Sequence, residues 1–153
     1  TYTKGTFILS NKWDKRFLEM AGLVASWSKD PSTKVGTIAV RNRTVIAQGY
    51  NGFPRGIDDN DRLDNRTIKY MYIVHSEMNA IYNAAENGVS LKGSTIYTVG
   101  LPVCHDCAKG LIQVGIKRVV TPEIETPKRW LKSLSLTEEM FKEANIAWDR
   151  IKL

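Results

Sequence analysis

The sequence has little of what stabilises small secreted proteins or anchors membrane proteins. It contains two cysteines, Cys104 and Cys107, which are too few for a disulfide framework. No apolar run approaches the roughly 20 residues that a membrane-spanning helix needs. Residues 1–10 lack the basic, apolar and small regions of a signal peptide, and we find no repeats, low-complexity tracts or linker. We therefore expect a single domain over residues 1–153, located in the cytoplasm without a membrane partner.

The composition is that of a folded, charged domain. Hydrophobic residues make up 42% of the 153 residues and charged residues 25%, as in globular proteins. The formal net charge of +6 serves solubility or attracts phosphate, which a nucleotide and a nucleic acid both carry. Charge alone does not separate these readings.

Hydrophobic periodicity predicts helices that alternate with strands. We expect helices at 11–30, 75–87, 104–114 and 135–145, and strands at 35–40, 44–48, 95–99, 117–121 and 146–150. A capping box, Ser135 to Glu138, is expected to begin the last helix, and residues 49–74 form a long polar loop in this interpretation. Such alternation implies a sheet with helices on both faces and with its later strands parallel.

Two of the predicted helices begin with side chains that can hold a metal. His75 and Glu77 open one helix, and Cys104 and Cys107 open a later one. If both helices begin at the same edge of the sheet, one imidazole and two thiols converge there. Helix N-termini favour thiolates, and three protein ligands leave the fourth zinc position to water, as in catalytic sites. Glu77 would then take a proton from a water whose pKa zinc lowers to about 7.

Each part of this pattern has a simpler explanation. C-x-x-C alone is more often a structural zinc site or a redox motif. His105, between the two cysteines, would make the site structural if it were a fourth ligand, although its position on the helix points it elsewhere. The four tryptophans are expected in the core or at a subunit interface. The joint occurrence of the histidine, the glutamate and the two cysteines is what favours a catalytic zinc site.

The pattern resembles the H-x-E…P-C-x-x-C signature of zinc deaminases, with two departures. Val103 separates Pro102 from Cys104, and Ser76 stands where the family often has alanine. Four segments are moreover similar to the deoxycytidylate deaminase family of the cytidine deaminase superfamily: SKDPSTKVG (28–36), GYNGFPRG (49–56), HSEMNAI (75–81) and CHDCAKGLIQVGIK (104–117).

The resemblance implies the fold, the reaction and the assembly. The fold would be α/β, a three-layer α/β/α cytidine-deaminase-like architecture with a mixed five-stranded sheet. The reaction would be the zinc-dependent hydrolysis of dCMP to dUMP, which feeds thymidylate synthesis, with one catalytic zinc ion. The assembly would be a homohexamer or another homo-oligomer, activated by dCTP and inhibited by dTTP.

The resemblance also assigns roles to residues. His75, Cys104 and Cys107 would hold zinc, Glu77 would move protons, and Asn51 would bind the sugar. Candidates for the phosphate contact are Lys29, Lys34 and Arg55, each of which is otherwise a solvated charge. Effector nucleotides would contact Gly49, Tyr50, Asn51 and Gly52, where the simpler explanation is a turn that needs glycine.

One segment departs from the family after the fourth strand. Residues 121–125 read TPEIE, where the family leads us to expect an aromatic residue or an arginine. Their two carboxylates would repel phosphate, which leaves the phosphate contact and the regulation open. Two rival functions also remain: a deaminase of tRNA or single-stranded nucleic acid, and a module with structural zinc and no catalysis.

Overall fold

The computed structural model describes the backbone of residues 4–153 and the side chains from residue 12 onward. Its centre is one five-stranded sheet of strand order β2-β1-β3-β4-β5. The strands are β1 (Gly36–Arg41), β2 (Thr44–Tyr50), β3 (Thr95–Val99), β4 (Arg118–Pro122) and β5 (Ala147–Ile151). β1 is antiparallel to β2 and β3, whereas β3, β4 and β5 are parallel. The expected mixed sheet is thus confirmed, including its parallel later strands.

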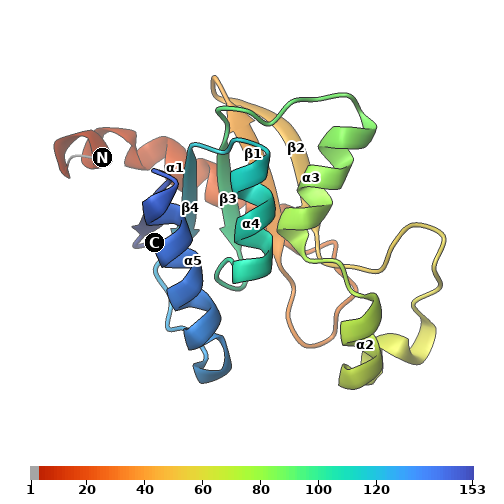
Figure 1. Cartoon of the computed structure of the whole chain (residues 1–153). Coiled ribbons are helices and arrows are strands. Elements are labelled where there is room, and N and C mark those ends of the chain that lie inside the picture. Colours follow the sequence, from red (N-terminus) through yellow and green to blue (C-terminus); the bar gives the residue numbers. More distant parts are fainter. Residues whose placement is uncertain (1–3) are drawn as a thin grey trace.

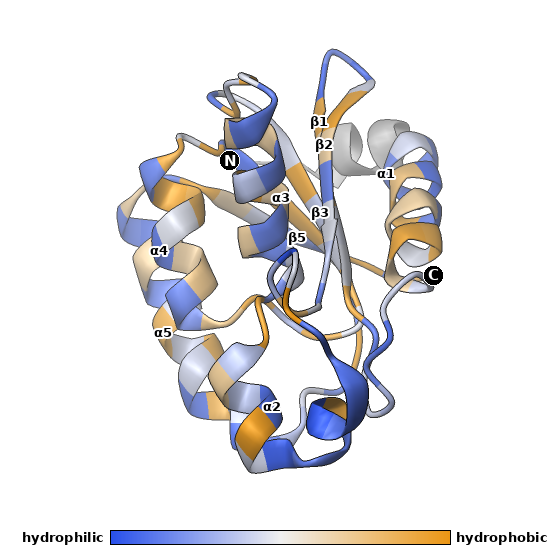
Figure 2. Cartoon of the chain, turned by 90° about the vertical axis from the view of Figure 1, so that its right-hand side faces the viewer, coloured by the Kyte–Doolittle hydropathy of each residue, from blue (hydrophilic) through white to orange (hydrophobic). Residues whose placement is uncertain are grey.

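Helices cover both faces of this sheet. On one face lies α1 (Lys4–Ala25), and on the other lie α3 (Ser76–Glu86), α4 (His105–Gln113) and α5 (Leu131–Glu143), as Figures 1 and 2 show from two sides. One apolar core lies between α1 and the sheet, around Phe17 and Ile38. A second core lies on the opposite face, around Leu111 and Phe141. The three-layer α/β/α fold class is confirmed.

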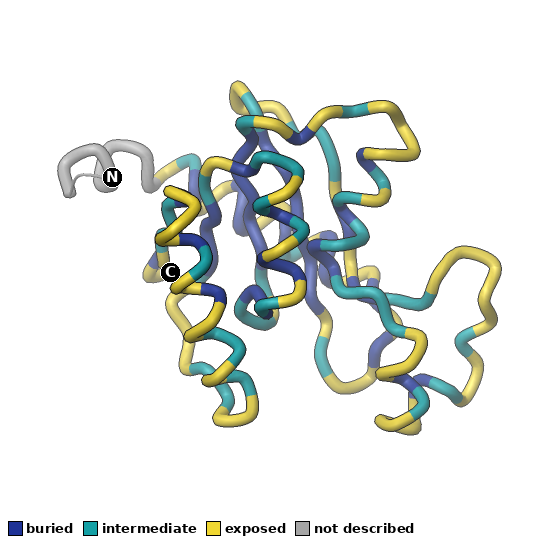
Figure 3. The backbone as a smooth tube through the Cα atoms, in the orientation of Figure 1, coloured by how far each residue is buried: buried dark blue, intermediate teal, exposed yellow. Residues whose placement is uncertain are grey.

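The polar stretch after β2 is not all loop. It contains a 3-10 helix, η1 (Asn60–Asp64), and a short helix, α2 (Arg66–Tyr72), whose start is capped by the Asn65 side chain. Figure 3 shows this part of the chain as largely exposed. The prediction of a loop over 49–74 was therefore wrong for residues 60–72, because their apolar residues are too few to show a helical period.

Two helix boundaries also differ from the prediction. α1 ends at Ala25, and the chain then turns, so residues 26–30 lie beyond the helix. α5 follows a 3-10 turn, η2 (Lys128–Trp130), and begins at Leu131. Ser135 therefore lies inside α5 rather than at a capping box. Thr137 of that box is buried and donates to the carbonyl oxygen of Val103 at 2.9 Å. No helix in the described part of the chain has the length and apolar character to cross a membrane.

Candidate active site

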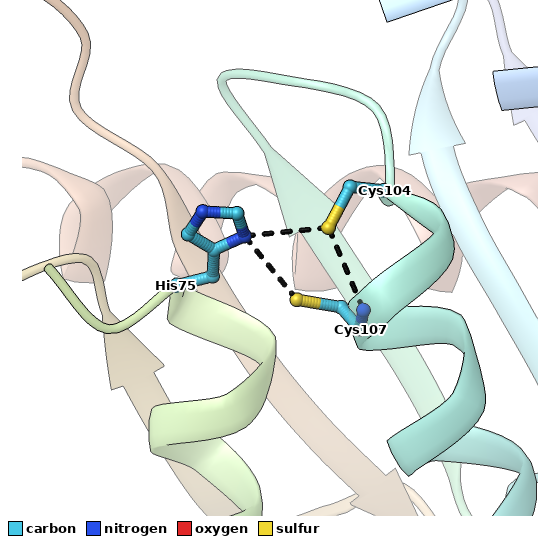
Figure 4. A group of neighbouring side chains, drawn as sticks. All are labelled: His75, Cys104 and Cys107. Atoms are coloured by element: carbon cyan, nitrogen blue, oxygen red, sulfur yellow. Dashed lines mark hydrogen bonds between the residues drawn. The ribbon is translucent and has the colours of Figure 1, made fainter. Parts of the chain in front are cut away.

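Three side chains with metal-binding atoms meet at the start of α3 and α4. His75 is the residue before α3, and Cys104 is the residue before α4. The Nδ1 atom of His75 lies 3.3 Å from Sγ of Cys104 and 3.4 Å from Sγ of Cys107 (Figure 4). The expectation that both helices begin at one edge of the sheet, and that these three residues converge, is confirmed.

The donor set fits zinc. Zinc–sulfur and zinc–nitrogen bonds of about 2.3 and 2.0–2.1 Å place sulfur and nitrogen about 3.5 Å apart in a tetrahedron. The two sulfur–nitrogen distances in the structure lie close to this separation, and the three ligand atoms all lie within 4.8 Å of one another. Among the described residues, His75, Cys104 and Cys107 form the one such group. They are positioned to bind one metal ion, with one tetrahedral position left for another ligand.

The electrostatics of the three ligands favour a bound cation. Hydrogen bonds with Cys107 and His75 lower the pKa of Cys104 to about 4. The contact with Cys104 raises the pKa of His75 and, together with burial, that of Cys107. A divalent ion between the two sulfurs would stabilise both as thiolates.

Glu77 lies beside the three ligands and is almost completely buried. Its exposed fraction is 3%, and burial raises the pKa of its carboxyl group, as does the nearby Cys104. A hydrogen bond of 2.8 Å from the Ser76 hydroxyl to Oε1 acts in the opposite direction. Glu77 is thus a buried carboxyl group beside the metal ligands, with a pKa raised above that of an ordinary glutamate.

A cavity opens next to these groups. It is lined by His75, Glu77 and Cys104, and further by Asp30, Asn51, Arg66, Lys69, Leu101, Pro102, Arg129 and Trp130 among others. One wall is held by a buried ion pair between Lys69 and Asp30, at 3.2 Å. Asn51 braces the same wall, because its amide donates to Asp30 and to the Thr33 carbonyl while its Oδ1 accepts from the Val35 amide.

The lysines and arginine expected at the phosphate lie elsewhere. Lys29 forms an ion pair with Asp59 at 3.4 Å, and Arg55 forms one with Glu86 at 2.8 Å. Lys34 is exposed. None of the three lines the cavity.

The segment expected at effector nucleotides is tied to its neighbours. A Cβ atom at Gly49 would lie 2.3 Å from the Ala80 backbone nitrogen, so this glycine lets α3 pack directly on β2. Gly52 forms an isolated bridge with Val74. The ring of Tyr50 is 40% exposed and packs edge-on against Trp27.

Several residues of the cavity were missed by sequence reasoning. Arg66 and Lys69 come from α2, which was read as loop, and Arg129 and Trp130 come from η2. As expected, Trp130 packs against an apolar core. It also lines the cavity, and its buried Nε1 has no hydrogen-bond partner among the described residues. An aromatic residue or an arginine was expected near residues 121–125, and the cavity instead has Arg129 and Trp130 a few positions later.

His105 and Val103 were the two sequence features that spoke against a catalytic zinc site, and their positions are compatible with one. His105 is not a fourth ligand, because its Nδ1 bonds to the Ser133 hydroxyl at 2.8 Å. Val103, the extra residue before Cys104, is fully buried in the core.

Comparison with known proteins places the site in context. Residues 11–123 match the zinc-binding region of cytidine and deoxycytidylate deaminases. The chain is 40% identical over 138 residues to an uncharacterized deaminase of the luxG 3′ region in Aliivibrio fischeri, covering 89% of this chain and 91% of that protein. It is 39% identical over 116 residues to deoxycytidylate deaminase of Homo sapiens, covering 71% of this chain and 64% of the human enzyme.

A solved structure supports the same architecture. The dCMP deaminase of cyanophage S-TIM5, crystallised with dCMP and dUMP, superposes with a TM-score of 0.72 at 23% identity, covering 92% of this chain and 97% of the phage chain. At this identity the likeness concerns the fold. The family is carried by the sequence matches and by the metal-ligand geometry.

Proposed function

The chain belongs to the cytidine and deoxycytidylate deaminase family, and from this premise we propose that it hydrolyses dCMP to dUMP. The observation that carries the proposal is the cavity that joins His75, Glu77 and Cys104 to unpaired cationic side chains. Human deoxycytidylate deaminase, of which the chain spans less than two thirds, is named for this reaction. In the reaction, water adds to C4 of cytosine, the C4–N bond breaks, and ammonia leaves.

The residues of this chain divide the chemistry between them. Zinc, when held by His75, Cys104 and Cys107, supplies a water molecule of lowered pKa. Glu77 accepts a proton from the attacking water and delivers protons to the ring nitrogen and to the leaving amine. Asn51 lines the cavity and keeps a lone pair on Oδ1 for a sugar hydroxyl. Three ligands beside an open cavity disfavour a purely structural zinc module.

Arg66 and Arg129 are the side chains we assign to the phosphate. Both line the cavity, and neither forms an ion pair with a described carboxylate. Lys29 and Arg55 differ on both counts, because each is paired and lies outside the cavity. An unpaired guanidinium offers a phosphate two parallel hydrogen bonds, which a paired one offers only after losing its carboxylate.

The test compares a nucleotide with its nucleoside. Purified protein is given dCMP, deoxycytidine, cytidine, dCTP and a tRNA anticodon stem, and ammonia release is measured. We expect turnover of dCMP to exceed that of deoxycytidine, and we expect Arg66→Ala with Arg129→Ala to raise the KM for dCMP about 10- to 100-fold while deoxycytidine turnover is unchanged. Lys29→Ala with Arg55→Ala is the rival pair. If the KM for dCMP rose only in the Lys29→Ala, Arg55→Ala variant, the assignment of Arg66 and Arg129 to the phosphate would be rejected. Preferential deamination of the tRNA stem, with strong inhibition by salt, would reject the nucleotide as the substrate.

Assembly, regulation and location are further parts of the proposal. Exposed apolar side chains on α1 and nearby, Met20, Leu23, Trp27 and Tyr50, support a homo-oligomer such as a hexamer, which light scattering would measure. The exposed Tyr50 ring is the part of residues 49–52 open to dCTP or dTTP, and adding each to the reaction tests regulation. Two buried free cysteines support the reducing cytoplasm.

A further inference from the structure

Three buried hydroxyl groups form a continuous row from the sheet to Glu77. Thr98 and Thr37 are direct neighbours across β3 and β1, with their Oγ1 atoms 2.8 Å apart. Oγ1 of Thr37 lies 2.8 Å from Oγ of Ser76, and Ser76 donates to Oε1 of Glu77 at 2.8 Å. All three hydroxyl residues have an exposed fraction of 0%. We call this set, Thr98, Thr37 and Ser76, the hydroxyl chain.

The carboxylate fixes the direction of every hydrogen bond in the hydroxyl chain. A carboxylate only accepts, and a hydroxyl group has a single hydrogen. Because Ser76 donates its hydroxyl hydrogen to Glu77, Thr37 must be the donor in the bond between Thr37 and Ser76. The bond between Thr98 and Thr37 must then be donated by Thr98. All three dipoles therefore point toward Glu77, and hydrogen bonds aligned in this way strengthen one another.

The packing of α3 brings the hydroxyl chain together. Ser76 is the first residue of α3, and it reaches Thr37 because α3 lies directly on the sheet. This close approach depends on Gly49, where a Cβ atom would lie 2.5 Å from the Ser76 carbonyl oxygen. Thr37 is opposite Gly49 on one side and opposite Thr98 on the other. The sheet register thus aims the hydroxyl chain at the start of α3.

We propose that the hydroxyl chain positions Glu77 for proton transfer, with Ser76 as the contact and Thr37 and Thr98 acting through it. The inference rests on the proposed deamination. Ser76 and Thr37 are positioning residues, since the Ser76 hydroxyl bonds to Glu77 and Thr37 reaches Glu77 only through Ser76. The hydroxyl chain holds one carboxylate oxygen, which restricts the side chain to the orientation that faces the cavity.

A structural role alone makes a different prediction. Buried hydroxyl groups need partners, and the row could serve only that need. Removing one hydroxyl would then lower the thermal stability and leave kcat alone. A positioning role requires kcat to fall while the KM for dCMP stays the same, because the Ser76 residue is fully buried and its hydroxyl bonds to Glu77 and Thr37.

A double-mutant cycle separates the two roles. We expect Ser76→Ala to lower kcat for dCMP about tenfold, the scale of a hydrogen bond to a charged group, with zinc content and KM unchanged. Thr37→Val should lower kcat about threefold in the presence of Ser76 and have no effect in the Ser76→Ala background. Thr95→Val, at another buried threonine of β3, is the control and should leave kcat unchanged. Additive effects of Ser76→Ala and Thr37→Val, or an unchanged kcat in Ser76→Ala, would overturn the inference.

A second measurement does not require turnover. The hydroxyl proton of Ser76 should exchange slowly with solvent in nuclear magnetic resonance spectra of the zinc-loaded and zinc-free protein. Thr37→Val should accelerate that exchange at least about tenfold, because it removes the donor that orders Ser76. A rate that Thr37→Val leaves unchanged would reject the hydroxyl chain even if the wild-type protein deaminates nothing. Absence of wild-type turnover together with slow exchange would instead reject the proposed function and confine the hydroxyl chain to a structural role.

Discussion

The two faces of the sheet each carry a buried polar cluster, and the clusters differ in what their groups are left free to do. Under α1, the guanidinium of Arg118 bonds both oxygens of Asp14 at 2.9 and 2.8 Å and Asp149 at 2.8 Å, while the Tyr97 hydroxyl donates to Asp14. We call these four residues the Asp14 cluster. Its polar groups bond to one another within the protein, which ties α1 to β3, β4 and β5.

The cavity face is arranged in the opposite way. Three metal-binding side chains converge there. Two exposed arginines, Arg66 and Arg129, have no described carboxylate partner. The buried indole N–H of Trp130 has no acceptor among the described residues. Buried polar groups left without partners cost free energy, and an exposed arginine without a carboxylate partner is free to bind an anion. Their concentration around one cavity therefore marks the face that is completed by ligands, whereas the Asp14 cluster is complete without them.

Among the predictions, removing the metal should have the largest effect on dCMP turnover. We expect a chelator to reduce dCMP turnover to background and zinc to restore it, since no other described group of ligands can hold the ion. Cys104→Ala should lose zinc and stay inactive after zinc is added. Metal analysis gives the occupancy, and a Cys104→Ala protein with a full complement of zinc would contradict the ligand assignment.

The next largest effect is expected at Glu77. Glu77→Gln keeps the shape and removes the proton carrier, so kcat should fall about 10²- to 10⁴-fold while zinc occupancy and melting temperature are retained. In the wild type, burial raises the pKa of Glu77, and the base must be ionised, so turnover should decline as pH falls through a value above that of an ordinary glutamate. A Glu77→Gln variant that turns over at the wild-type rate would disprove the mechanism.

The sequence predicts those residues of the active site whose positions depend on local structure. The metal ligands and Glu77 follow from two short motifs at helix starts, and a helix start aims its first side chains in a fixed direction. Lys69 and Asp30 are paired across 39 positions of the chain, and Asp14 and Arg118 across 104. No local pattern announces such pairs, because they depend on how α1 and α2 pack.

The boundary of α5 illustrates the same limit. Ser135 to Glu138 reads as a capping box, yet α5 already begins at Leu131 and the buried Thr137 inside it bonds to Val103. A tertiary contact thus overrides a local signal. The same shift of the helix start brings Arg129 and Trp130 to the cavity, which is why both were missed.

A matched pair of arginine variants sharpens the contrast between the two faces. Arg118→Met leaves the buried Asp14 and the partly buried Asp149 without their cation, so we expect the free energy of unfolding to fall by about 3–5 kcal/mol. Arg129→Met removes an exposed, unpaired guanidinium and should change that free energy by less than about 0.5 kcal/mol while raising the KM for dCMP. Urea unfolding and steady-state kinetics measure both. Equal losses of stability in the two variants would contradict the distinction between the Asp14 cluster, whose groups bond to one another, and the cavity, whose arginines await a ligand.

The smallest expected effect is the pH dependence of the Asp14 cluster. Burial and the Asp14 carboxylate raise the pKa of Tyr97 above its ordinary value. A group whose pKa is raised by folding contributes stability below its unfolded pKa, about 10 for tyrosine, and loses it as pH rises further. The free-energy difference between wild type and Tyr97→Phe should therefore be constant below about pH 9.5 and shrink above pH 10 by at most about 1.4 kcal/mol per pH unit. Tyr82→Phe, at an exposed ring, is the control, and a Tyr97→Phe difference that stays flat to pH 11 would show that the hydroxyl is not held by Asp14.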